Sequence, residues 1–282
     1  MSDTKPKNIL DIEKLSVVFD TNDTKGHCAL NSVDLTILEG ETLGLVGESG
    51  SGKTVLALSI LGLLPRNGSI TSGSIRFDGN DLIRKSEAEL QAIRGKEIAM
   101  IFQDPQASLN PVYRVGQQIE WIMKAHRGVI GREAKSEIIQ LFESVRLREP
   151  ERCFFCYPHE LSGGMCQRVM IAMAVACRPK LLIADEPTSA LDVTIQAEIV
   201  DLLANIRDQF GMSMLFITHD LGIASHLCEK IVVLQTGEVV ERGATNQVFT
   251  APKADYTRKL LQSLFVPKVG AETTPTELVA AV

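Results

Sequence analysis

Residues 42–54 read Thr-Leu-Gly-Leu-Val-Gly-Glu-Ser-Gly-Ser-Gly-Lys-Thr, and this stretch decides the fold of the chain. It opens with a short apolar run, Thr42 to Val46, that is typical of a buried strand. The rest, Gly47 to Thr54, matches the phosphate-loop pattern G-x-x-x-x-G-K-[ST]. From Lys53 to Leu64 the apolar residues have helical spacing, and Pro65 closes the segment. Strand, glycine-rich loop and helix thus follow one another in the order that a phosphate-binding loop requires.

The glycines of this loop permit a tight turn and a close approach of the backbone to a ligand. Backbone N–H groups from Gly50 through Thr54 can then cradle phosphate oxygens at the positive end of the helix. We expect Lys53 to neutralise the β and γ phosphates of ATP and Thr54 to bind Mg²⁺. The alternative is an ordinary glycine-rich turn, which the flanking strand and helix disfavour. The expected nucleotide-binding residues of the loop are Gly47, Glu48, Ser49, Gly50, Ser51, Gly52, Lys53 and Thr54.

A second motif is the apolar run Leu181 to Ala184, which ends in two adjacent carboxylates, Asp185 and Glu186. Acids at the end of a buried strand cost free energy unless they contact a cation or solvent. The alternative is a strand that simply runs into a loop, which would show the same pattern. Beside a phosphate loop, Asp185 is expected to hold Mg²⁺. Glu186 is then the expected general base, which orients and deprotonates the attacking water.

The order of strand-like and helix-like segments predicts an α/β fold with a mostly parallel sheet. Period-two segments at Ile9–Phe19 and Val33–Leu38 predict an N-terminal antiparallel β subdomain. Helical spacing dominates between Val115 and Val145, so we expect an inserted helical subdomain at about 104–160. After it, strands and helices alternate as far as the turn at Gly237. The last residues, Gly270–Val282, are rich in Thr, Glu and Ala and are expected to fray.

Composition limits the possible functions. The chain has 282 residues, 45% of them hydrophobic, and a formal net charge of −6, which disfavours nucleic acid as a partner. Its apolar runs are far shorter than the roughly 20 residues that cross a bilayer. Because Met1–Asn8 is polar and no long apolar segment follows it, we expect no secretory signal and a cytoplasmic location. Six cysteines include only one C-x-x-C pair, Cys153 and Cys156, which is too few for a four-ligand metal site.

The stretch Leu161-Ser162-Gly163-Gly164-Met165-Cys166-Gln167 precedes a helical segment and could be an ordinary N-cap. It resembles the signature L-S-G-G-x-x-Q of ABC ATPases, about twenty residues before the acidic strand as in that family. The resemblance covers roughly residues 9 to 265. It implies a P-loop NTPase fold of the ABC ATPase type over 1–265, with 266–282 as a flexible tail.

The resemblance also implies roles for residues that would otherwise be unremarkable. Gln103 corresponds to the glutamine that contacts Mg²⁺ and senses a membrane partner, His219 to the switch histidine, and Asp192 to the D-loop aspartate. Phe19 stands where the family places an aromatic ring that stacks on adenine, although it could equally belong to the core. Ser162, Gly163 and Gly164 would contact the γ-phosphate bound by a second subunit, so the family's hydrolytic site forms only in a head-to-tail dimer.

Within the family, four segments are similar to the dipeptide, oligopeptide and nickel importers: Tyr157-Pro158-His159-Glu160, Gly163-Gly164-Met165 in the signature, Ala184–Thr188 and Thr194–Ala197. The resemblance implies membrane permease subunits, a second ATP-binding subunit and an external binding protein as partners, at the cytoplasmic face of the inner membrane. Cys166 departs from the arginine that relatives often carry, and the cysteine-containing extension of many peptide importers is not found. The expected function is therefore ATP hydrolysis that energises an importer of di- or oligopeptides, with nickel as the alternative cargo. The choice between homodimer and heterodimer and the role of Cys153, Cys156 and Cys166 stay open.

Two other functions compete. A soluble ABC ATPase acting on DNA or ribosomes would share these motifs, but it would carry a long coiled-coil insertion or a tandem second cassette. A small-molecule kinase could use the same phosphate loop. The signature and His219 argue against the kinase.

Overall fold

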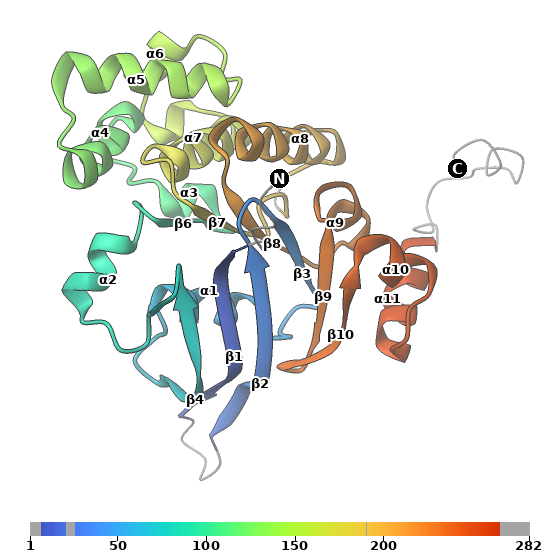
Figure 1. Cartoon of the computed structure of the whole chain (residues 1–282). Helices are drawn as coiled ribbons and strands as arrows, with labels where there is room; N and C mark the ends of the chain where they lie inside the picture. Colours follow the sequence, from blue (N-terminus) through green and yellow to red (C-terminus); the bar gives the residue numbers. More distant parts are fainter. Residues whose placement is uncertain (1–6, 21–25, 190, 266–282) are drawn as a thin grey trace, which may run out of the picture.

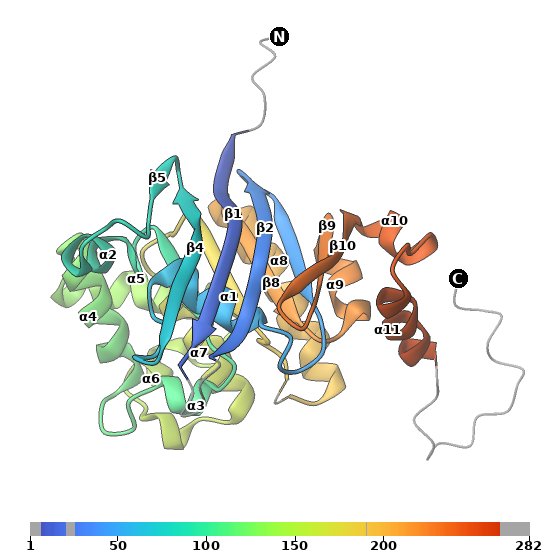
Figure 2. The same cartoon turned by 90° about the horizontal axis from the view of Figure 1, so that it is seen from below.

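The computed structural model describes residues 7–20, 26–189 and 191–265. Two sheets and a group of helices make up this part of the chain, and Figures 1 and 2 show their arrangement. The segment predicted to fray lies outside the described residues. None of the helices in the described ranges combines the length and apolar character that crossing a bilayer would need.

The larger sheet has the strand order β10-β9-β3-β8-β7-β6, and every neighbouring pair is parallel except β10 with β9. The mostly parallel sheet predicted from the sequence is therefore confirmed. Its strands β3, β7 and β8 are buried along their whole length, which fits their continuous apolar runs. The strands are β3 (Thr42–Val46), β6 (Ile98–Ile101), β7 (Leu181–Asp185), β8 (Ser213–Thr218), β9 (Lys230–Gln235) and β10 (Glu238–Ala244).

The smaller sheet is antiparallel, with the order β2-β1-β4-β5, and its strands lie side by side in Figure 2. Helix α1 lies between the two sheets, where Leu56 and Ile60 join a core with Leu10 and Leu45. The sheet consists of β1 (Asn8–Phe19), β2 (His27–Leu38), β4 (Gly68–Phe77) and β5 (Asn80–Asp81).

Two boundaries in this half differ from the prediction. Strand β2 starts at His27 rather than Val33, because pairing with β1 extends to the register Phe19–His27. Helix α1 (Lys53–Leu61) ends before Leu64, because Gly62 adopts a left-handed conformation with φ 62°. The N–H of Gly62 caps the helix at the carbonyls of Leu58 and Ser59.

A group of helices fills the chain between β6 and β7, where the sequence predicts the helical insertion. Helices α4, α5 and α6 form the upper left of Figure 1, at the opposite side of the molecule from α10 and α11. Buried residues such as Ile119, Ile138 and Val169 join these helices to α7 in one core. The boundary of this subdomain stays a prediction. The helices are α3 (Pro105–Ser108), α4 (Val115–Arg127), α5 (Gly131–Ser144), α6 (Pro150–Phe154), the 3₁₀ turn η1 (Pro158–Glu160) and α7 (Gly163–Val175).

The remaining helices are α2 (Glu87–Ile93), α8 (Val193–Phe210), α9 (Leu221–Leu227), α10 (Thr245–Thr250) and α11 (Asp255–Phe265). Sequence reasoning anticipated α8 and α9 and missed α2, α10, α11 and the edge strand β10. The short elements α2 and α10 lack a long apolar period. Strand β10 is mostly exposed or half-buried, so it shows no continuous apolar run either.

Candidate nucleotide site

The phosphate loop joins the end of β3 to α1, and two of its glycines are required by packing. A Cβ at Gly47 would lie 2.2 Å from the carbonyl oxygen of Leu234. A Cβ at Gly52, where φ is 105°, would lie 2.7 Å from the carbonyl oxygen of Ala29. Neighbouring strands therefore press directly against the loop, and only glycine fits.

Lys53 is the first residue of α1, and its side chain is 5% exposed. Its Nζ donates hydrogen bonds to the carbonyl oxygens of Gly47, at 2.8 Å, and Glu48, at 2.9 Å. Burial lowers the pKa of Lys53, although the carboxylates of Glu186 and Asp185 act in the opposite direction. The ammonium group is thus folded back over the loop and close to two acids.

Asp185 ends β7 and is 3% exposed. Burial raises its pKa, while a hydrogen bond with Thr54 acts against that rise. Within the described part of the chain, its Oδ1 has no hydrogen-bond partner. A buried carboxylate oxygen without a partner is costly, and a cation bound beside Thr54 would satisfy it.

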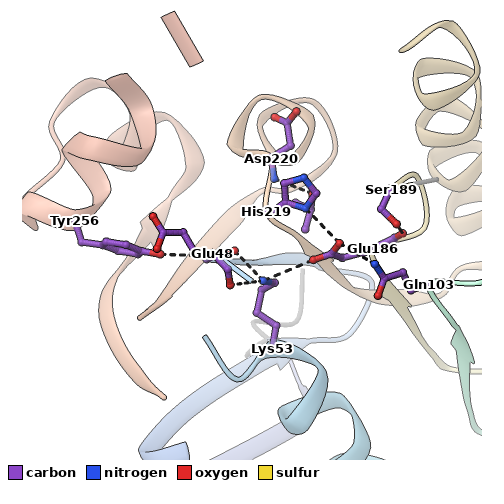
Figure 3. Close-up of polar contacts among 10 residues, drawn as sticks. Glu48, Lys53, Gln103, Glu186, Ser189, His219, Asp220 and Tyr256 are labelled. Atoms are coloured by element: carbon purple, nitrogen blue, oxygen red, sulfur yellow. Dashed lines mark hydrogen bonds and ion pairs between the residues drawn. The ribbon is translucent and has the colours of Figure 1, made fainter. Parts of the chain in front are cut away.

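Glu186 follows Asp185 and meets residues from three other segments (Figure 3). Its carboxylate lies 3.7 Å from Nζ of Lys53 and 3.3 Å from Nδ1 of His219, and it accepts a 3.5 Å hydrogen bond from Gln103. Glu186, His219 and Gln103 follow the carboxyl ends of the parallel strands β7, β8 and β6, and Lys53 follows the loop after β3. Open α/β sheets bind ligands at this edge.

The backbone at Glu186 is strained, because its φ of 45° lies in the left-handed region. This conformation costs an ordinary residue about 1–2 kcal/mol. Two contacts hold it. The N–H of Glu186 donates to the carbonyl of Ile217 at 2.9 Å, and its own carbonyl accepts from the hydroxyl of Ser189 at 3.1 Å. Backbone strain of this kind persists where surrounding contacts hold it, and it clusters at functional sites.

A cavity of about 610 Å³ lies over the phosphate loop. It has the loop and α1 on one side and Phe19 of β1 on another, while Gln103, Glu186 and His219 line it from the edge of the large sheet. Sequence reasoning anticipated ten of its lining residues, which are Phe19, Glu48, Ser49, Gly50, Gly52, Lys53, Thr54, Gln103, Glu186 and His219.

Three anticipated loop and strand residues lie just behind this cavity rather than on its wall. Gly47 and Ser51 belong to the buried back of the loop, and Asp185 lies in the buried end of β7. Four lining residues were missed: His27, Ala29, Val55 and Leu260. Tyr256 was missed as well, although its hydroxyl accepts a 3.0 Å hydrogen bond from the N–H of Glu48. No local sequence pattern marks these residues, because their positions depend on packing between distant elements.

The remaining anticipated residues lie away from the cavity. Ser162 caps α7, its hydroxyl accepting from the N–H of Met165, and Asp192 caps α8 in the same way from Ile195. Gly163 and Gly164 form the first turn of α7. Ser162, Gly163, Gly164 and Asp192 are not among the residues that line the cavity within this one chain.

The parallel sheet, the glycine-rich loop at a helix N-terminus, and the adjacent acids define a P-loop nucleotide-binding protein. The model of the ABC transporter family matches residues 30–189. A peptidoglycan transport ATP-binding protein, YejF, of Agrobacterium fabrum is 50% identical over 93% of this chain and 48% of its own length. The dipeptide transport ATP-binding protein DppD of Haemophilus influenzae is 48% identical over 91% of this chain and 77% of its own length.

A solved ATP-binding cassette, dimeric in a post-hydrolysis state with ADP and Pi, is 29% identical. It superposes with a TM-score of 0.75, over 84% of this chain and 98% of the cassette. The chain belongs to the ABC transporter family, and its fold is that of an ABC ATPase cassette. It spans about half the length of the first relative, 48%, and about three quarters of the second, 77%.

Proposed function

We propose that this chain binds and hydrolyses ATP and thereby drives a membrane importer of peptides. The observation that carries the proposal is the contact of Glu186 with both Lys53 and His219 at the wall of the cavity over the phosphate loop. The names of the two relatives, one a peptidoglycan and one a dipeptide transport protein, favour peptides over nickel as the cargo.

ATP would bind with its phosphates on the loop and its base toward Phe19. The N–H groups at the start of α1 supply donors and a positive dipole for the phosphates. The Lys53 ammonium, which now contacts two loop carbonyls, is within a short side-chain movement of the same space. Phe19 offers a ring face at the other end of the cavity, where stacking on adenine supplies apolar contact.

Thr54 and Asp185 fit a Mg²⁺ ion, and Gln103 is the third candidate ligand. The partnerless Oδ1 of Asp185 and its contact with Thr54 support this assignment. Few protein ligands are needed, because Mg²⁺ in such sites keeps several waters and binds substrate phosphates. When bound, Mg²⁺ would neutralise charge on the phosphates.

Glu186 is the proposed general base, taking a proton from the water that attacks the γ-phosphate. His219 and Gln103 contact its carboxylate and would orient it toward that water. Lys53 also pairs with Glu186 in the nucleotide-free structure. Phosphate binding would draw Lys53 away from this pair and release the carboxylate for proton transfer.

A second subunit would complete the site. A Cβ at Gly163 would meet no heavy atom of the described residues within 4 Å, and one at Gly164 would meet only Ile195 at 3.6 Å. Packing within the chain therefore does not demand glycine at these positions. Small residues at a helix N-terminus leave its N–H groups open to a phosphate that a partner subunit holds. Ser162 and Asp192 would belong to the same contact face. The dimeric cassette of similar fold supports this arrangement.

The proposed assembly places the chain at the cytoplasmic face of the inner membrane, bound to permease subunits and acting with an external binding protein. The relatives' names as transport ATP-binding proteins support a membrane partner. Two measurements test the function: phosphate release from ATP by the purified protein, and uptake of a labelled dipeptide and of nickel in a strain lacking the gene. Normal dipeptide uptake with impaired nickel uptake would refute the peptide assignment.

A further inference from the structure

The helix α11 near the C-terminus contacts the phosphate loop through Tyr256, which has no part in the proposed hydrolysis. The hydroxyl oxygen of Tyr256 accepts a hydrogen bond from the N–H of Glu48 at 3.0 Å, across 208 residues of sequence (Figure 3). Burial raises the pKa of Tyr256, which keeps its phenol protonated at neutral pH. One turn further along α11, Leu260 lines the nucleotide cavity. The helix therefore forms part of the wall of the site.

The contact falls on a peptide group that also holds the side chain of Lys53. The N–H of Glu48 and the C=O of Gly47 belong to one planar trans peptide, so they point in opposite directions. Tyr256 occupies the N–H side, and Nζ of Lys53 donates to the C=O side at 2.8 Å. Rotation of this peptide would break both contacts together. The orientation of the Tyr256 hydroxyl thus bears directly on the position of the Lys53 ammonium.

A second contact fixes the helix that carries Tyr256. Glu241 of β10 is 9% exposed, and its two carboxylate oxygens accept hydrogen bonds from the N–H groups of Lys253, at 2.8 Å, and Ala254, at 3.0 Å. Burial acts to raise the pKa of Glu241, but the nearby Thr257 hydroxyl and the hydrogen bonds from these N–H groups outweigh it, so the pKa is lowered. The carboxylate remains ionised, and its two hydrogen bonds hold the residues just before α11 against β10 of the large sheet.

We propose that Tyr256 is a positioning residue for ATP binding, which fixes the Gly47–Glu48 peptide and through it the Lys53 ammonium. Glu241 supports it by fixing α11. This inference rests on the proposed function, since it assigns a partner to the loop that would hold the phosphates. It adds a step that the motif alone does not contain: an element near the C-terminus sets the geometry of a loop near the N-terminus.

The test is Tyr256→Phe, which removes one oxygen atom and keeps the ring. Titration calorimetry of the full chain with ATP and with ADP should show both dissociation constants raised about 3- to 10-fold, the worth of one hydrogen bond. The turnover number at saturating ATP should stay within about two-fold and KM should rise, because binding is weakened equally before and in the transition state. Tyr113→Phe is the matched control, since Tyr113 lies 40% exposed outside the cavity. It should change neither constant.

A merely structural role for Tyr256 would lower the melting temperature without a matching change in nucleotide affinity. Glu241→Gln provides a second, independent variant, because its amide NH₂ would face one of the two N–H donors and loosen α11. It should also raise the dissociation constant for ATP, and the double variant should lose less affinity than the product of the two single losses. If the wild-type protein binds ATP and Tyr256→Phe binds it equally well, the inference is wrong. If the wild-type protein itself does not bind ATP, the proposed function is refuted, and so is this inference, which rests on it.

Discussion

At the scale of single residues, the candidate site combines features that oppose stability. Asp185 is a buried acid with a raised pKa, Lys53 is a buried base with a lowered pKa, and Glu186 has a strained backbone. Perturbed ionisable groups and strain gather at functional sites because the fold around them holds them in place. Each of the three can be tested by one substitution.

Replacing Lys53 by alanine should weaken ATP binding about 10- to 100-fold, because charge-assisted hydrogen bonds to phosphate are worth about 1.5–3 kcal/mol. Calorimetric titration with ATP measures the loss. An unchanged dissociation constant would mean that the lysine, despite its place in the loop, does not reach the phosphates.

Glu186→Gln keeps the size of the side chain and its hydrogen bonding but removes the proton acceptor. ATP binding should survive, while steady-state phosphate release should fall by about 100- to 10,000-fold, the usual worth of a positioned general base. Near-normal turnover in this variant would assign the proton transfer to another group, with His219 the first to test.

Asp185→Asn should raise the stability of the protein and lower its ATPase activity. Because burial raises the pKa of Asp185, the native protein binds more protons than the unfolded chain between the two pKa values. Stability from this group therefore rises as pH falls through that window, and the ionised carboxylate is a cost at pH 7. The nucleotide-free variant should melt at least about 2 °C higher at pH 7, whereas ATP hydrolysis with Mg²⁺ should fall at least about 100-fold.

The comparison of the wild-type protein and Asp185→Asn by calorimetry at pH 7 and near pH 4 provides the control. The gain in melting temperature should shrink at the lower pH, because more of the wild-type carboxyl is protonated there. A variant that melts lower than wild type at pH 7 would contradict the assignment of Asp185 as a destabilising buried charge.

At the scale of elements, the N-terminus of α7 is the surface that we propose contacts a second subunit. Ser162 caps the helix, and a Cβ at either of the two glycines after it would clash with none of the described residues. Capping explains a serine at position 162 within one chain. It does not explain two glycines at the start of a helix, where glycine is unfavourable.

Ser162→Arg should therefore separate binding from turnover. The bulky cation would block the approach of a second subunit, while the nucleotide cavity of the same chain, which Ser162 does not line, stays intact. We expect the dissociation constant for ATP to remain within about three-fold, after a loss of about 1 kcal/mol of helix capping. Phosphate release should fall at least about 100-fold. Loss of ATP binding by the isolated chain would contradict this geometry.

At the scale of the whole molecule, the residues proposed to complete the nucleotide site, Ser162 and Asp192, do not line the cavity of their own chain, which suits a subunit that works in an assembly. The proposed dimer should form only around bound ATP, because each chain supplies the signature residues for the other chain's nucleotide. A variant that hydrolyses ATP slowly should therefore accumulate as this dimer.

Gel filtration of Glu186→Gln should thus show a dimer with ATP and Mg²⁺ and a monomer without nucleotide. The double variant Glu186→Gln with Ser162→Arg is the control and should elute as a monomer in both conditions. A monomer in every condition would mean that the partner is a different ATP-binding subunit, which mixing with that subunit then tests. A dimer that ignores nucleotide would contradict a head-to-tail ATP interface.

The sequence by itself determined the phosphate loop, the acidic strand and the signature, and with them the class of fold. This was possible because each motif needs consecutive residues of fixed type: glycines for a tight loop, a lysine at the helix start, and acids at the end of an apolar strand. The alternation of apolar runs with helical periods then predicted the parallel sheet.

Only the tertiary structure decided which residues meet at the site. Glu186 touches Gln103 and His219, and Tyr256 touches Glu48, across separations of 83, 33 and 208 residues. It also decided that β10 and α11 exist, because β10 forms by pairing with β9 and α11 contacts α9, a distant segment of the chain. Contacts between distant segments depend on how the elements pack, and no local pattern of residues records that packing.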